Sequence, residues 1–447
     1  MAAAVKEEVF REVNRLIELA LSDRERLGGF DLEALELLTR EVMHRCGAMI
    51  LEKLVEHEDG GALADDCECG GRFINQKRES KRVHTVLGEI RITRRIQRCR
   101  LCGSWRVPED MMLDVVQTGF SPYLRRLMAK VGAEVCFDKG RDFLFDLAGV
   151  RVTDKEVERV AEAVGADIGC REEARLALAL EGDLAAKRES PEILYLTADG
   201  TGVPVLRRET EGRRGKGEDG LARSREAKLG AVFTQTKVDH DGYPLRDPDS
   251  TTYVGQIENA ESFGRRLYAE AVSRGLNQAP KVVVIGDGAP WVWNLADLHF
   301  PGATKIVDFY HAAEHLGELA RLLHPQDEVG RKAWFKGMRK KLKKGEVAEI
   351  ISLLRGLKGR GRKKEEVEKC TAYLEKNKER MRYDKFRSQG LFIGSGVVEA
   401  GCKTVIGKRL KQSGMHWSVR GANSIIALRC CLESGYFEDY WESRRAA

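Results

Sequence analysis

The stretch from Ile193 to Thr201 reads ILYLTADGT and brings an aspartate, Asp199, to the end of a short apolar run that leads into two glycines. An apolar run of this length predicts a β-strand. A carboxylate at the end of such a strand is costly unless it is paired, hydrogen-bonded or bound to a cation. We therefore expect partners for Asp199 elsewhere in the chain.

Two further carboxylates occupy comparable positions. KVVVIGDG, from Lys281, has four consecutive β-branched residues, which is typical of a strand buried on both faces, and Asp287 follows between two glycines. GSGVVEAGCK, from Gly394, predicts a helix that begins at about Gly396 with Glu399 in its first turn. Two strands and one helix are thus expected to deliver three carboxylates.

The order of elements after Pro191 is typical of an RNase H-like α/β core. Two strand patterns, at 193–199 and 229–239, are joined by a charged, glycine-rich connection, and a third short strand is expected near Thr252. An amphipathic helix that ends at Gly275 precedes the strand at 281–286. In this order the first and fourth strands are neighbours, which would bring the two aspartates together at one edge of the sheet.

Asp199, Asp287 and Glu399 form a set of hard oxygen ligands, which selects Mg²⁺ or Mn²⁺. Two such ions about 4 Å apart can activate a nucleophilic water or 3′-hydroxyl and stabilise the leaving oxygen of a phosphodiester. Three acids gathered without a metal would repel one another. The alternative is that each carboxylate only caps a turn.

Asp308 ends another strand pattern, TKIVDFYH, and competes with Asp287 for the place beside the first aspartate. It is predicted to be a metal ligand or an accessory residue, and His311 and Lys403 are the other accessory candidates. His311 and His315 lie one helical turn apart. Zinc binding and a hydrogen-bond network beside the catalytic helix are the two interpretations of this pair.

Four cysteines form two closely spaced pairs, each followed by glycine, with a hairpin pattern between them. They predict a zinc-ribbon-like module, because tetrahedral zinc takes four soft ligands from two turns. A set of free buried thiols is the alternative, since the first pair is C-x-C rather than C-x-x-C. Arginines around the second pair suit contact with a phosphate backbone or form a solvated face. The cysteines are Cys67, Cys69, Cys99 and Cys102, and the arginines are Arg94, Arg95, Arg98, Arg100 and Arg106.

Residues 331–364 are strongly basic, and apolar residues keep helical spacing beneath the charge, so this segment is predicted to be folded helix. A charge run is often a solvated face, but this density of a single sign favours nucleic acid. His416 and Trp417 are interpreted either as contacts to DNA ends or as core residues. The cations predicted to bind DNA are Arg339, Lys340, Lys341, Lys343, Lys344, Lys408, Arg409 and Lys411.

The first 190 residues are mostly helical in pattern outside the cysteine module. Two amphipathic helices are expected between residues 5 and 55, separated by Gly28 and Gly29. From Ser121 the pattern is again helical, and a capping box at Thr153–Glu156 opens a helix that is predicted to close at Gly165. This region is interpreted as a helix-turn-helix or as a structural bundle.

Composition narrows the class of protein. The 447 residues carry 76 Lys plus Arg and 70 Asp plus Glu, a net charge of +6, so a basic surface has to come from clustering. Eleven unevenly spaced cysteines and an acidic N-terminus favour a reduced, cytoplasmic protein, associated with the nucleoid when it is bound to DNA. No stretch approaches the roughly eighteen apolar residues of a membrane span.

The segments TADGTGVP, VIGDGAPWVWN, KIVDFYHAAEHL and GSGVVEAGCK, the last followed by RLKQSGMHWS, together resemble DDE transposases of bacterial insertion sequences, specifically the ISKra type. The resemblance covers about 194–435 and, less specifically, the cysteines upstream. It implies that Asp199, Asp287 and Glu399 are the catalytic triad of an RNase H-like core. It also implies binding of terminal inverted repeats, Mg²⁺-assisted cleavage and strand transfer, and at least a dimer on DNA.

The expected organisation follows from these assignments. A catalytically silent DNA-binding derivative and an RNase H-like nuclease are the alternative functions. The expected parts are a helical region at 1–60, a zinc-ribbon-like module at 61–110, a helical region at 111–190, the first part of the catalytic core at 191–311, a basic helical insertion at 312–390 and the last part of the core at 391–447.

Overall fold

The structure, a computed structural model, describes residues 2–26, 31–57, 66–186, 191–215, 219–357 and 360–445. It is a mixed α/β fold in two compact units. Unit 1 comprises residues 1–163 and 441–447, and unit 2 comprises residues 164–440. Within the described residues, no helix has the length and apolar character needed to span a bilayer.

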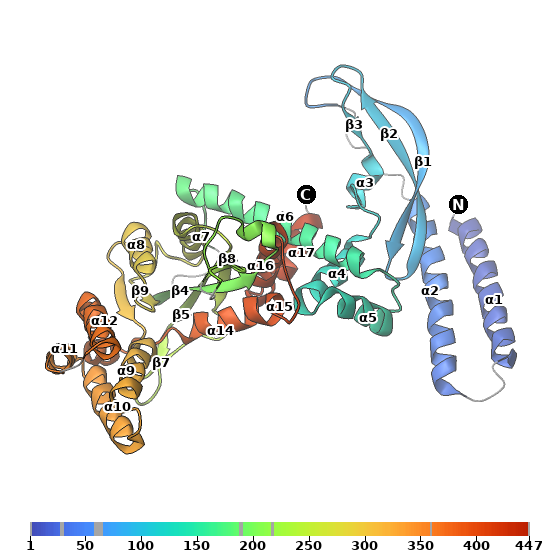
Figure 1. Ribbon diagram of the computed structural model, residues 1–447. Coiled ribbons are helices and arrows are strands. Elements are labelled where there is room, and N and C mark those ends of the chain that lie inside the picture. Colours follow the sequence, from blue (N-terminus) through green and yellow to red (C-terminus); the bar gives the residue numbers. More distant parts are fainter. Residues whose placement is uncertain are drawn as a thin grey trace. The chain divides into compact units, whose positions relative to one another are not determined.

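Unit 1 contains two long N-terminal helices and a two-stranded ribbon, to which a third, short strand is added (Figure 1). The antiparallel strands β1 and β2 meet at a tight turn, where Thr85 pairs with Gly88. One face of the ribbon is apolar and packs against α2, with Val83, Ile90 and Ile92 buried there. The elements are α1 (Ala2–Arg26), α2 (Leu32–His57), β1 (Phe73–Thr85), β2 (Gly88–Cys99) and β3 (Trp105–Arg106).

The two expected N-terminal helices and the hairpin are confirmed, although Gly28 and Gly29 lie outside the described residues. Three shorter helices, α3 to α5, and the long helix α6 follow the ribbon. Gly149 ends α5 in the left-handed conformation at φ 67°, which glycine adopts without strain. The helices are α3 (Pro108–Met112), α4 (Pro122–Glu134), α5 (Phe137–Ala148) and α6 (Asp154–Glu181).

Helix α6 corrects one prediction. The capping box is present, since the Thr153 N–H donates to Glu156 Oε2 at 2.7 Å and the Glu156 N–H donates to Thr153 Oγ1 at 3.2 Å. The helix does not close at Gly165, however, but continues to Glu181. A Cβ at Gly165 would lie 2.0 Å from the backbone oxygen of Ser424 in α16. Gly165 therefore lets α6 pack closely against α16 and does not end the helix.

Unit 2 is built on a five-stranded mixed sheet with the strand order β10-β9-β4-β5-β8. β4 pairs in parallel with β9, which pairs in parallel with β10, whereas β4, β5 and β8 are antiparallel neighbours. The expected adjacency of the first and fourth strands is thus confirmed. The strands are β4 (Ile193–Pro204), β5 (Ser224–Gln235), β8 (Thr252–Gln256), β9 (Lys281–Gly286) and β10 (Thr304–Val307), and β6 (Lys237–Val238) pairs separately with β7 (Pro244–Leu245).

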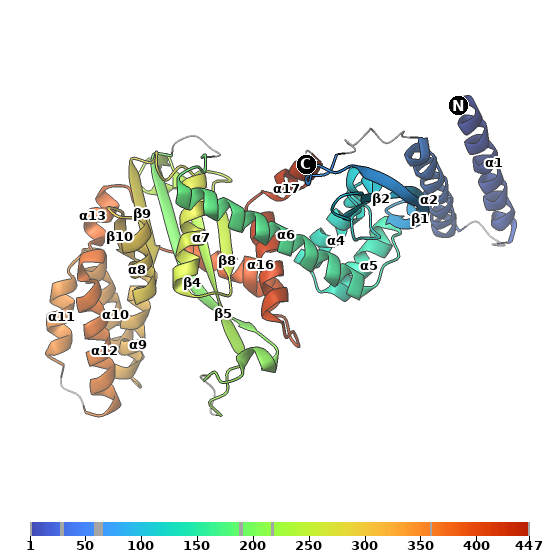
Figure 2. The same cartoon turned by 90° about the horizontal axis from the view of Figure 1, so that it is seen from above.

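Helices cover both faces of this sheet (Figure 2). A Cβ at Gly230 of β5 would meet Leu267 of α7, whereas one at Gly255 of β8 would meet Ile426 of α16, so α7 and α16 pack on opposite faces. The strands are consequently buried on both sides. The helices of this part of the chain are α7 (Ala260–Ser273), α8 (Pro290–His299), α14 (Gly396–Gly401), the π-helix η3 (Cys402–Gly407), α15 (Lys408–Leu410) and α16 (Val419–Glu433), and α17 (Phe437–Arg445) follows α16 in the sequence.

A group of helices follows β10 and precedes α14. Their buried apolar residues, including Leu342, Ile350 and Leu374, belong to the same hydrophobic core as the strands. The helices are therefore anchored to the sheet and do not form a detached tail. They are α9 (Phe309–Leu323), α10 (Glu328–Lys343), α11 (Val347–Arg355), α12 (Arg362–Asn377) and α13 (Tyr383–Ser388).

Candidate functional site

Asp199 lies where the parallel pairing of β4 with β9 ends. The last paired residues are Thr197 and Ile285, so that Asp199 and Asp287 each follow two residues later. β4 does not end at Asp199 as expected, but continues to Pro204 because β5 keeps pairing with it. The half-buried carboxylate accepts the Gly200 N–H at 2.7 Å.

The pKa of Asp199 depends on the charges of the other two predicted carboxylates. Burial raises the pKa of Asp199 above its usual range, and the negative charges of Asp287 and Glu399 raise it further. Hydrogen bonds from the Gly200 N–H and from Cys402 oppose this increase. Like charges at short range stabilise one another's protonated form, and a bound cation would remove that repulsion.

Asp287 sits in a turn that is held from two sides. Its Oδ1 accepts the Ala289 N–H at 2.8 Å, and its backbone carbonyl accepts the Tyr373 hydroxyl at 2.9 Å. Gly288 has φ 101°, and a Cβ there would lie 2.6 Å from the Tyr373 ring. Tyr373 of α12 therefore packs directly on the turn that carries this carboxylate.

Glu399 is in the first turn of α14, as expected. Gly401 lets α14 approach the sheet, because a Cβ there would lie 2.6 Å from the Tyr253 ring. The chain continues as η3, and π-helical segments often mark functional sites. Cys402 begins η3 beside Asp199, and burial together with that carboxylate raises the pKa of the thiol to about 12.

Asp308 occupies a different position from the other three acids. It is fully buried and caps α9, where its Oδ1 accepts the His311 N–H at 2.7 Å. Its Oδ2 accepts both the backbone N–H and, at 2.7 Å, the hydroxyl of Ser395. Ser395 Oγ also lies 3.1 Å from Glu399 Oε1. These contacts favour an accessory role, in which Asp308 fixes the turn that carries Glu399.

The histidine pair lies in α9 and packs against α12. The His311 and His315 rings are 4.8 Å apart, and the His315 and Tyr373 rings are 4.4 Å apart. Burial and the neighbouring His311 lower the pKa of His315, which favours its neutral form. Among the described residues, neither histidine belongs to a group of three or more candidate metal ligands. The zinc interpretation of this pair therefore finds no support.

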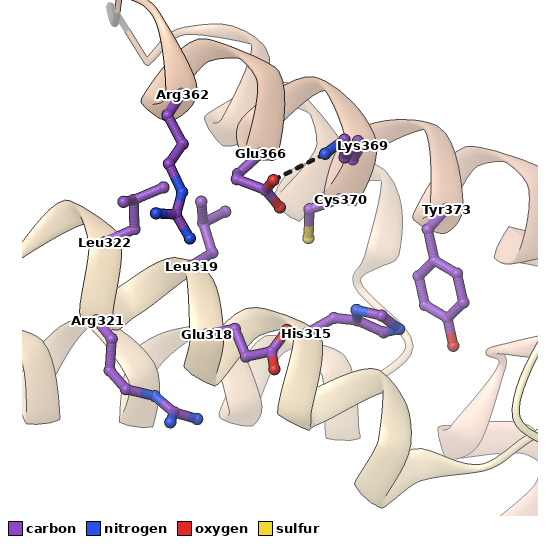
Figure 3. A pocket seen from close by; sticks show the side chains of 10 residues that line it. All are labelled: His315, Glu318, Leu319, Arg321, Leu322, Arg362, Glu366, Lys369, Cys370 and Tyr373. Atoms are coloured by element: carbon purple, nitrogen blue, oxygen red, sulfur yellow. Dashed lines mark hydrogen bonds and ion pairs between the residues drawn. The ribbon is translucent and has the colours of Figure 1, made fainter. Parts of the chain in front are cut away.

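A cavity of about 620 Å³ opens between α9 and α12. Figure 3 shows His315 and Tyr373 at one end of this cavity and Arg321 and Arg362 at the other. The Glu366–Lys369 ion pair, at 2.8 Å, lies on its α12 side. The end formed by His315 is electrostatically linked to the carboxylates, because the charge of Asp287 acts on the pKa of the imidazole.

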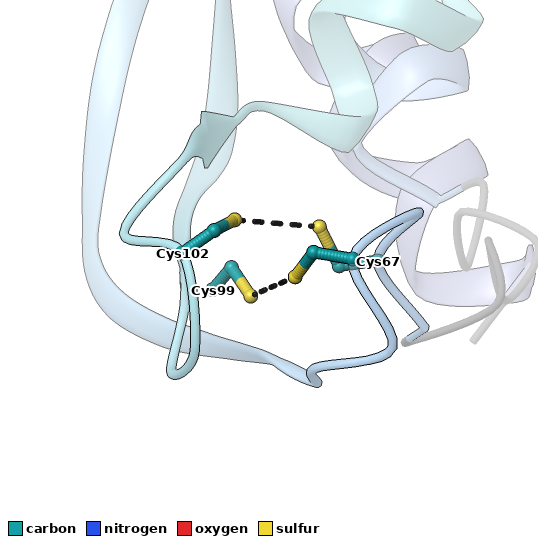
Figure 4. Close-up of side chains that lie close together, drawn as sticks. Cys67, Cys99 and Cys102 are labelled. Carbon is teal, nitrogen blue, oxygen red and sulfur yellow. Dashed lines mark hydrogen bonds between the residues drawn. The ribbon is translucent and has the colours of Figure 1, made fainter.

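The four cysteines predicted to bind zinc, all in unit 1, come together as predicted (Figure 4). Their sulfur atoms all lie within 4.8 Å of one another, with Cys67 Sγ 3.7 Å from Cys102 Sγ and Cys69 Sγ 3.6 Å from Cys99 Sγ. Tetrahedral zinc, with Zn–S distances of about 2.3 Å, would space its ligands by about 3.8 Å. Cys69 and Cys102 are exposed, which disfavours the alternative of buried thiols. This cluster could bind a metal such as zinc.

The predicted DNA-binding cations differ in their exposure. Arg409 is fully buried, with its guanidinium 5.0 Å from the Trp417 ring, so the prediction that it contacts DNA is wrong. Trp417 is itself buried and donates to the Leu410 carbonyl at 3.1 Å, which identifies it as a core residue. His416 is exposed. The exposed members of the predicted set are Arg339, Lys340, Lys343, Lys344, Lys408 and Lys411, to which the accessory candidate Lys403 is added.

The basic segment at 331–364 is less one-sided in charge than its sequence indicates. Lys341 is only half-exposed and lies 2.5 Å from Glu349. Arg355 lies 2.6 Å from Glu375 of α12, and Lys332 lies 2.7 Å from Glu328. Acids inside and outside the segment thus compensate part of its charge, including that of Lys344, which lies 3.7 Å from Glu346.

Sequence reasoning did not assign Tyr373, Ser395 or Cys402 to the site. Ser395 and Cys402 stand in the motif that carries Glu399, so their proximity to that residue was a usable signal. Tyr373 lies 86 positions from Asp287 in sequence and contacts only its backbone carbonyl. No pattern in the sequence marks such a contact.

Comparisons with known proteins give two sequence similarities. Residues 267–443 match the profile of an uncharacterised protein family, UPF0236, and this range includes Asp287, Asp308 and Glu399 but not Asp199. A Streptococcus gallolyticus protein described as "UPF0236 protein in vanSb 3'region" is 24% identical over 389 residues, which cover 82% of this chain and 75% of that protein. Neither description states an activity.

A comparison with solved structures found the Drosophila P element transposase strand transfer complex. The identity is 10%, and the match covers 75% of this chain and 85% of that chain, with a TM-score of 0.23. A TM-score this low does not establish a shared fold.

Proposed function

We propose that this protein is a DDE-type DNA transposase, which binds the ends of an insertion sequence and catalyses metal-dependent cleavage and strand transfer. The observation that carries the proposal is the convergence of three carboxylates from distant parts of the chain. The pKa of Asp199 responds to the charges of both Asp287 and Glu399. Acids are gathered in this way at sites that bind cations.

The strand order supports an RNase H-like core for this activity. Three antiparallel strands, β8, β5 and β4, are extended by the parallel strands β9 and β10. The adjacency of the first and fourth strands in this order is the one predicted from the sequence. Asp199 lies in β4 just past the end of its pairing with β9, Asp287 follows β9, and α14 packs against β4 with Glu399 in its first turn.

The residues at this site fit a divalent metal. Their donors are carboxylate oxygens, and a cation would relieve the mutual repulsion that raises the pKa of Asp199. Asp199, Asp287 and Glu399 would hold Mg²⁺ or Mn²⁺, which when bound activates the attacking water or 3′-hydroxyl and neutralises charge on the phosphodiester. Asp308 and Ser395 would hold the turn before Glu399, and Tyr373 would hold the turn of Asp287.

Other parts of the chain supply contacts to DNA in this proposal. The exposed cations near the end of α10, Arg339, Lys340, Lys343 and Lys344, would bind phosphates, and Lys408 and Lys411 would act closer to the carboxylates. The cysteine cluster would hold zinc and stabilise a zinc-ribbon-like module. A reaction at two DNA ends requires two active sites, so the protein would act as a homo-oligomer on DNA.

Cleavage of plasmid DNA tests the proposal. A supercoiled plasmid that carries the genomic DNA flanking the gene should be cut in Mg²⁺ and remain intact in EDTA. Asp199→Asn, Asp287→Asn and Glu399→Gln should each slow cleavage by at least about a hundredfold, equivalent to about 2.7 kcal/mol of transition-state stabilisation. The control Asp297→Asn, at an exposed acid that pairs with Lys305, should cleave as the wild type does.

The outcomes separate the proposed activity from the two alternatives. Joined products, in which a cleaved end is attached to a second DNA, support a transposase, whereas cleavage without joined products supports an RNase H-like nuclease. Binding of DNA without cleavage in either metal supports a silent derivative. Undiminished cleavage by Glu399→Gln would refute the assigned triad.

A further inference from the structure

The β1–β2 ribbon of unit 1 concentrates positive charge. Residues 73–99 contain eight Lys or Arg and two Glu, which leaves an excess of six positive charges. The whole chain carries a net charge of +6, so this short segment matches the charge of the entire protein. A surface of this density attracts polyanions.

On the packed face of the ribbon the cations are neutralised. Lys81 lies 2.9 Å from Asp110, and Arg94 lies 2.7 Å from the same carboxylate and also pairs with Glu79. These side chains surround the apolar contact between the ribbon and α2. They stabilise unit 1 and are not available to a ligand.

The opposite face has a different composition. Antiparallel pairing places Arg78 opposite Arg95, Ser80 opposite Thr93 and Arg82 opposite Arg91. We define the ribbon face by five of its exposed members, Arg78, Ser80, Arg82, Arg91 and Thr93; His84 and Glu89, at the turn end of the same face, are also exposed and pair with each other at 3.5 Å. Side chains of alternate residues share one face of a strand, so these five point the same way.

Few carboxylates form ion pairs with the arginines of this face. Within the described part of the chain, Arg78 and Arg91 form no ion pair with a carboxylate, and Arg82, whose side chain is 71% exposed, has only Glu89 at 3.8 Å. Arg95, by contrast, is held by Glu109 at 2.5 Å and is half-buried. Three arginines thus remain available to a ligand, and two hydroxyl side chains lie between them.

We propose that the ribbon face binds duplex DNA. The three arginines would contact phosphates, and the paired residues Ser80 and Thr93 would face the groove. Arg78 and Arg82 lie four residues apart on one strand, which corresponds to about 13 Å. The major groove is about 12 Å wide and admits a two-stranded β-ribbon. This inference rests on the proposed function for the identity of the DNA, but not for the binding itself.

The composition of the face favours duplex DNA over other anions. None of the five residues is aromatic, whereas proteins that bind single strands stack bases on aromatic rings. None is apolar, whereas protein interfaces centre on buried aromatic and apolar anchors. Guanidinium and hydroxyl groups are instead the usual donors to DNA phosphates and base edges.

Binding of the full-length protein to a labelled mixed-sequence duplex, without divalent metal, tests the inference. The triple variant Arg78→Gln, Arg82→Gln, Arg91→Gln should bind at least about tenfold more weakly, and its salt dependence should be shallower by about two to three charges. The matched control removes three exposed cations of unit 1 outside the ribbon, as Arg11→Gln, Lys130→Gln, Lys139→Gln, and should bind as the wild type does. Equal thermal unfolding midpoints would establish that all three proteins are folded.

Unchanged binding and salt dependence in the ribbon variant would overturn the inference, and so would an equal loss in the control. Tighter binding of the single-stranded form of the same probe would also contradict a duplex site. The Asp199→Asn variant keeps the two proposals distinguishable, because it should bind DNA normally while losing cleavage. A ribbon variant that binds normally in a protein that cleaves DNA would therefore reject the ribbon face alone.

Discussion

Asp308 illustrates how one buried carboxylate supports another. All of its hydrogen bonds are internal: it caps α9 through the His311 N–H and holds Ser395 through two donors. Because it is fully buried, its oxygens are already committed to the fold. Sequence position alone does not separate it from Asp287, since both follow a strand. Asp308 differs from Asp287 because Ser395, from a distant part of the chain, donates hydrogen bonds to its carboxylate.

Tyr373 is predicted to position Asp287. Tyr373→Phe removes the hydroxyl that donates to the Asp287 carbonyl at 2.9 Å, while the ring still fills the space beside Gly288. We expect a loss of about 1 kcal/mol in stability and a decrease of up to about tenfold in the cleavage rate, with DNA affinity unchanged. Denaturant unfolding and single-turnover cleavage measure the two effects.

Tyr436→Phe is the control for this prediction. Tyr436 donates at 2.9 Å to Glu270, away from the carboxylates, so its loss should lower stability without slowing cleavage. Equal cleavage rates for Tyr373→Phe and the wild type would show that the hydroxyl does not position Asp287.

Glu172 is predicted to make unit 2 less stable as pH rises. Burial raises its pKa to about 7, because its 3.3 Å contact with Arg266 is weaker than the contacts of Arg266 with Glu173 and Glu258 at 2.5 and 3.0 Å. The folded state then holds a proton that the unfolded state releases near pH 4.5. Stability from this group is full below about pH 4.5 and falls by up to about 3 kcal/mol as pH rises to about 7.

Urea unfolding of the wild type and Glu172→Gln between about pH 5 and pH 8 measures this effect. The amide cannot ionise, so the variant should gain stability relative to the wild type as pH rises. Glu258→Gln is the control, because it breaks a direct partner of Arg266 and should destabilise across the range. A constant difference between Glu172→Gln and the wild type would contradict the assignment.

Replacement of two glycines of α6 by alanine is predicted to change stability in opposite directions. Gly165→Ala would bring a Cβ to 2.0 Å from the backbone of Ser424, which should cost about 2–3 kcal/mol because backbone cannot easily move aside. Gly169→Ala meets nothing within 4 Å in the same helix and should stabilise it by about 0.5–1 kcal/mol. Denaturant unfolding of the two variants gives opposite signs if α6 packs on α16 as described. Stabilisation by both would refute this packing.

The sequence allowed most strands and helices of unit 2 to be predicted because their signals are local. Four β-branched residues define β9, and a reciprocal capping box defines the start of α6. Predictions failed where a contact between distant segments decided the outcome. Gly165 resembles a helix stop but accommodates Ser424, and Arg409 resembles a surface cation but is buried against Trp417. The proposed site follows the same division, since its carboxylates were predicted from local motifs and Tyr373 was not.

At the scale of the whole molecule, the cysteine cluster is predicted to bind one zinc ion per chain. Cys99→Ser removes the buried member of the cluster and should abolish stoichiometric zinc and lower the thermal stability of unit 1. Cys170→Ser, at an exposed cysteine outside the cluster, should retain both. Elemental analysis of the purified proteins measures the zinc content. Wild-type protein without zinc, or Cys99→Ser with the wild-type content, would reject a metal role for the cluster.

Asp199, Asp287 and Glu399 are predicted to form one site for a divalent cation. Calorimetric titration with Mn²⁺ tests it most directly, because the result does not depend on which DNA the protein recognises. The wild type and Asp297→Asn should bind Mn²⁺ with the same affinity, and Asp199→Asn should bind at least about tenfold more weakly, since the site loses a charged ligand. Equal Mn²⁺ binding by Asp199→Asn and the wild type would show that Asp199 is not a ligand of such a site.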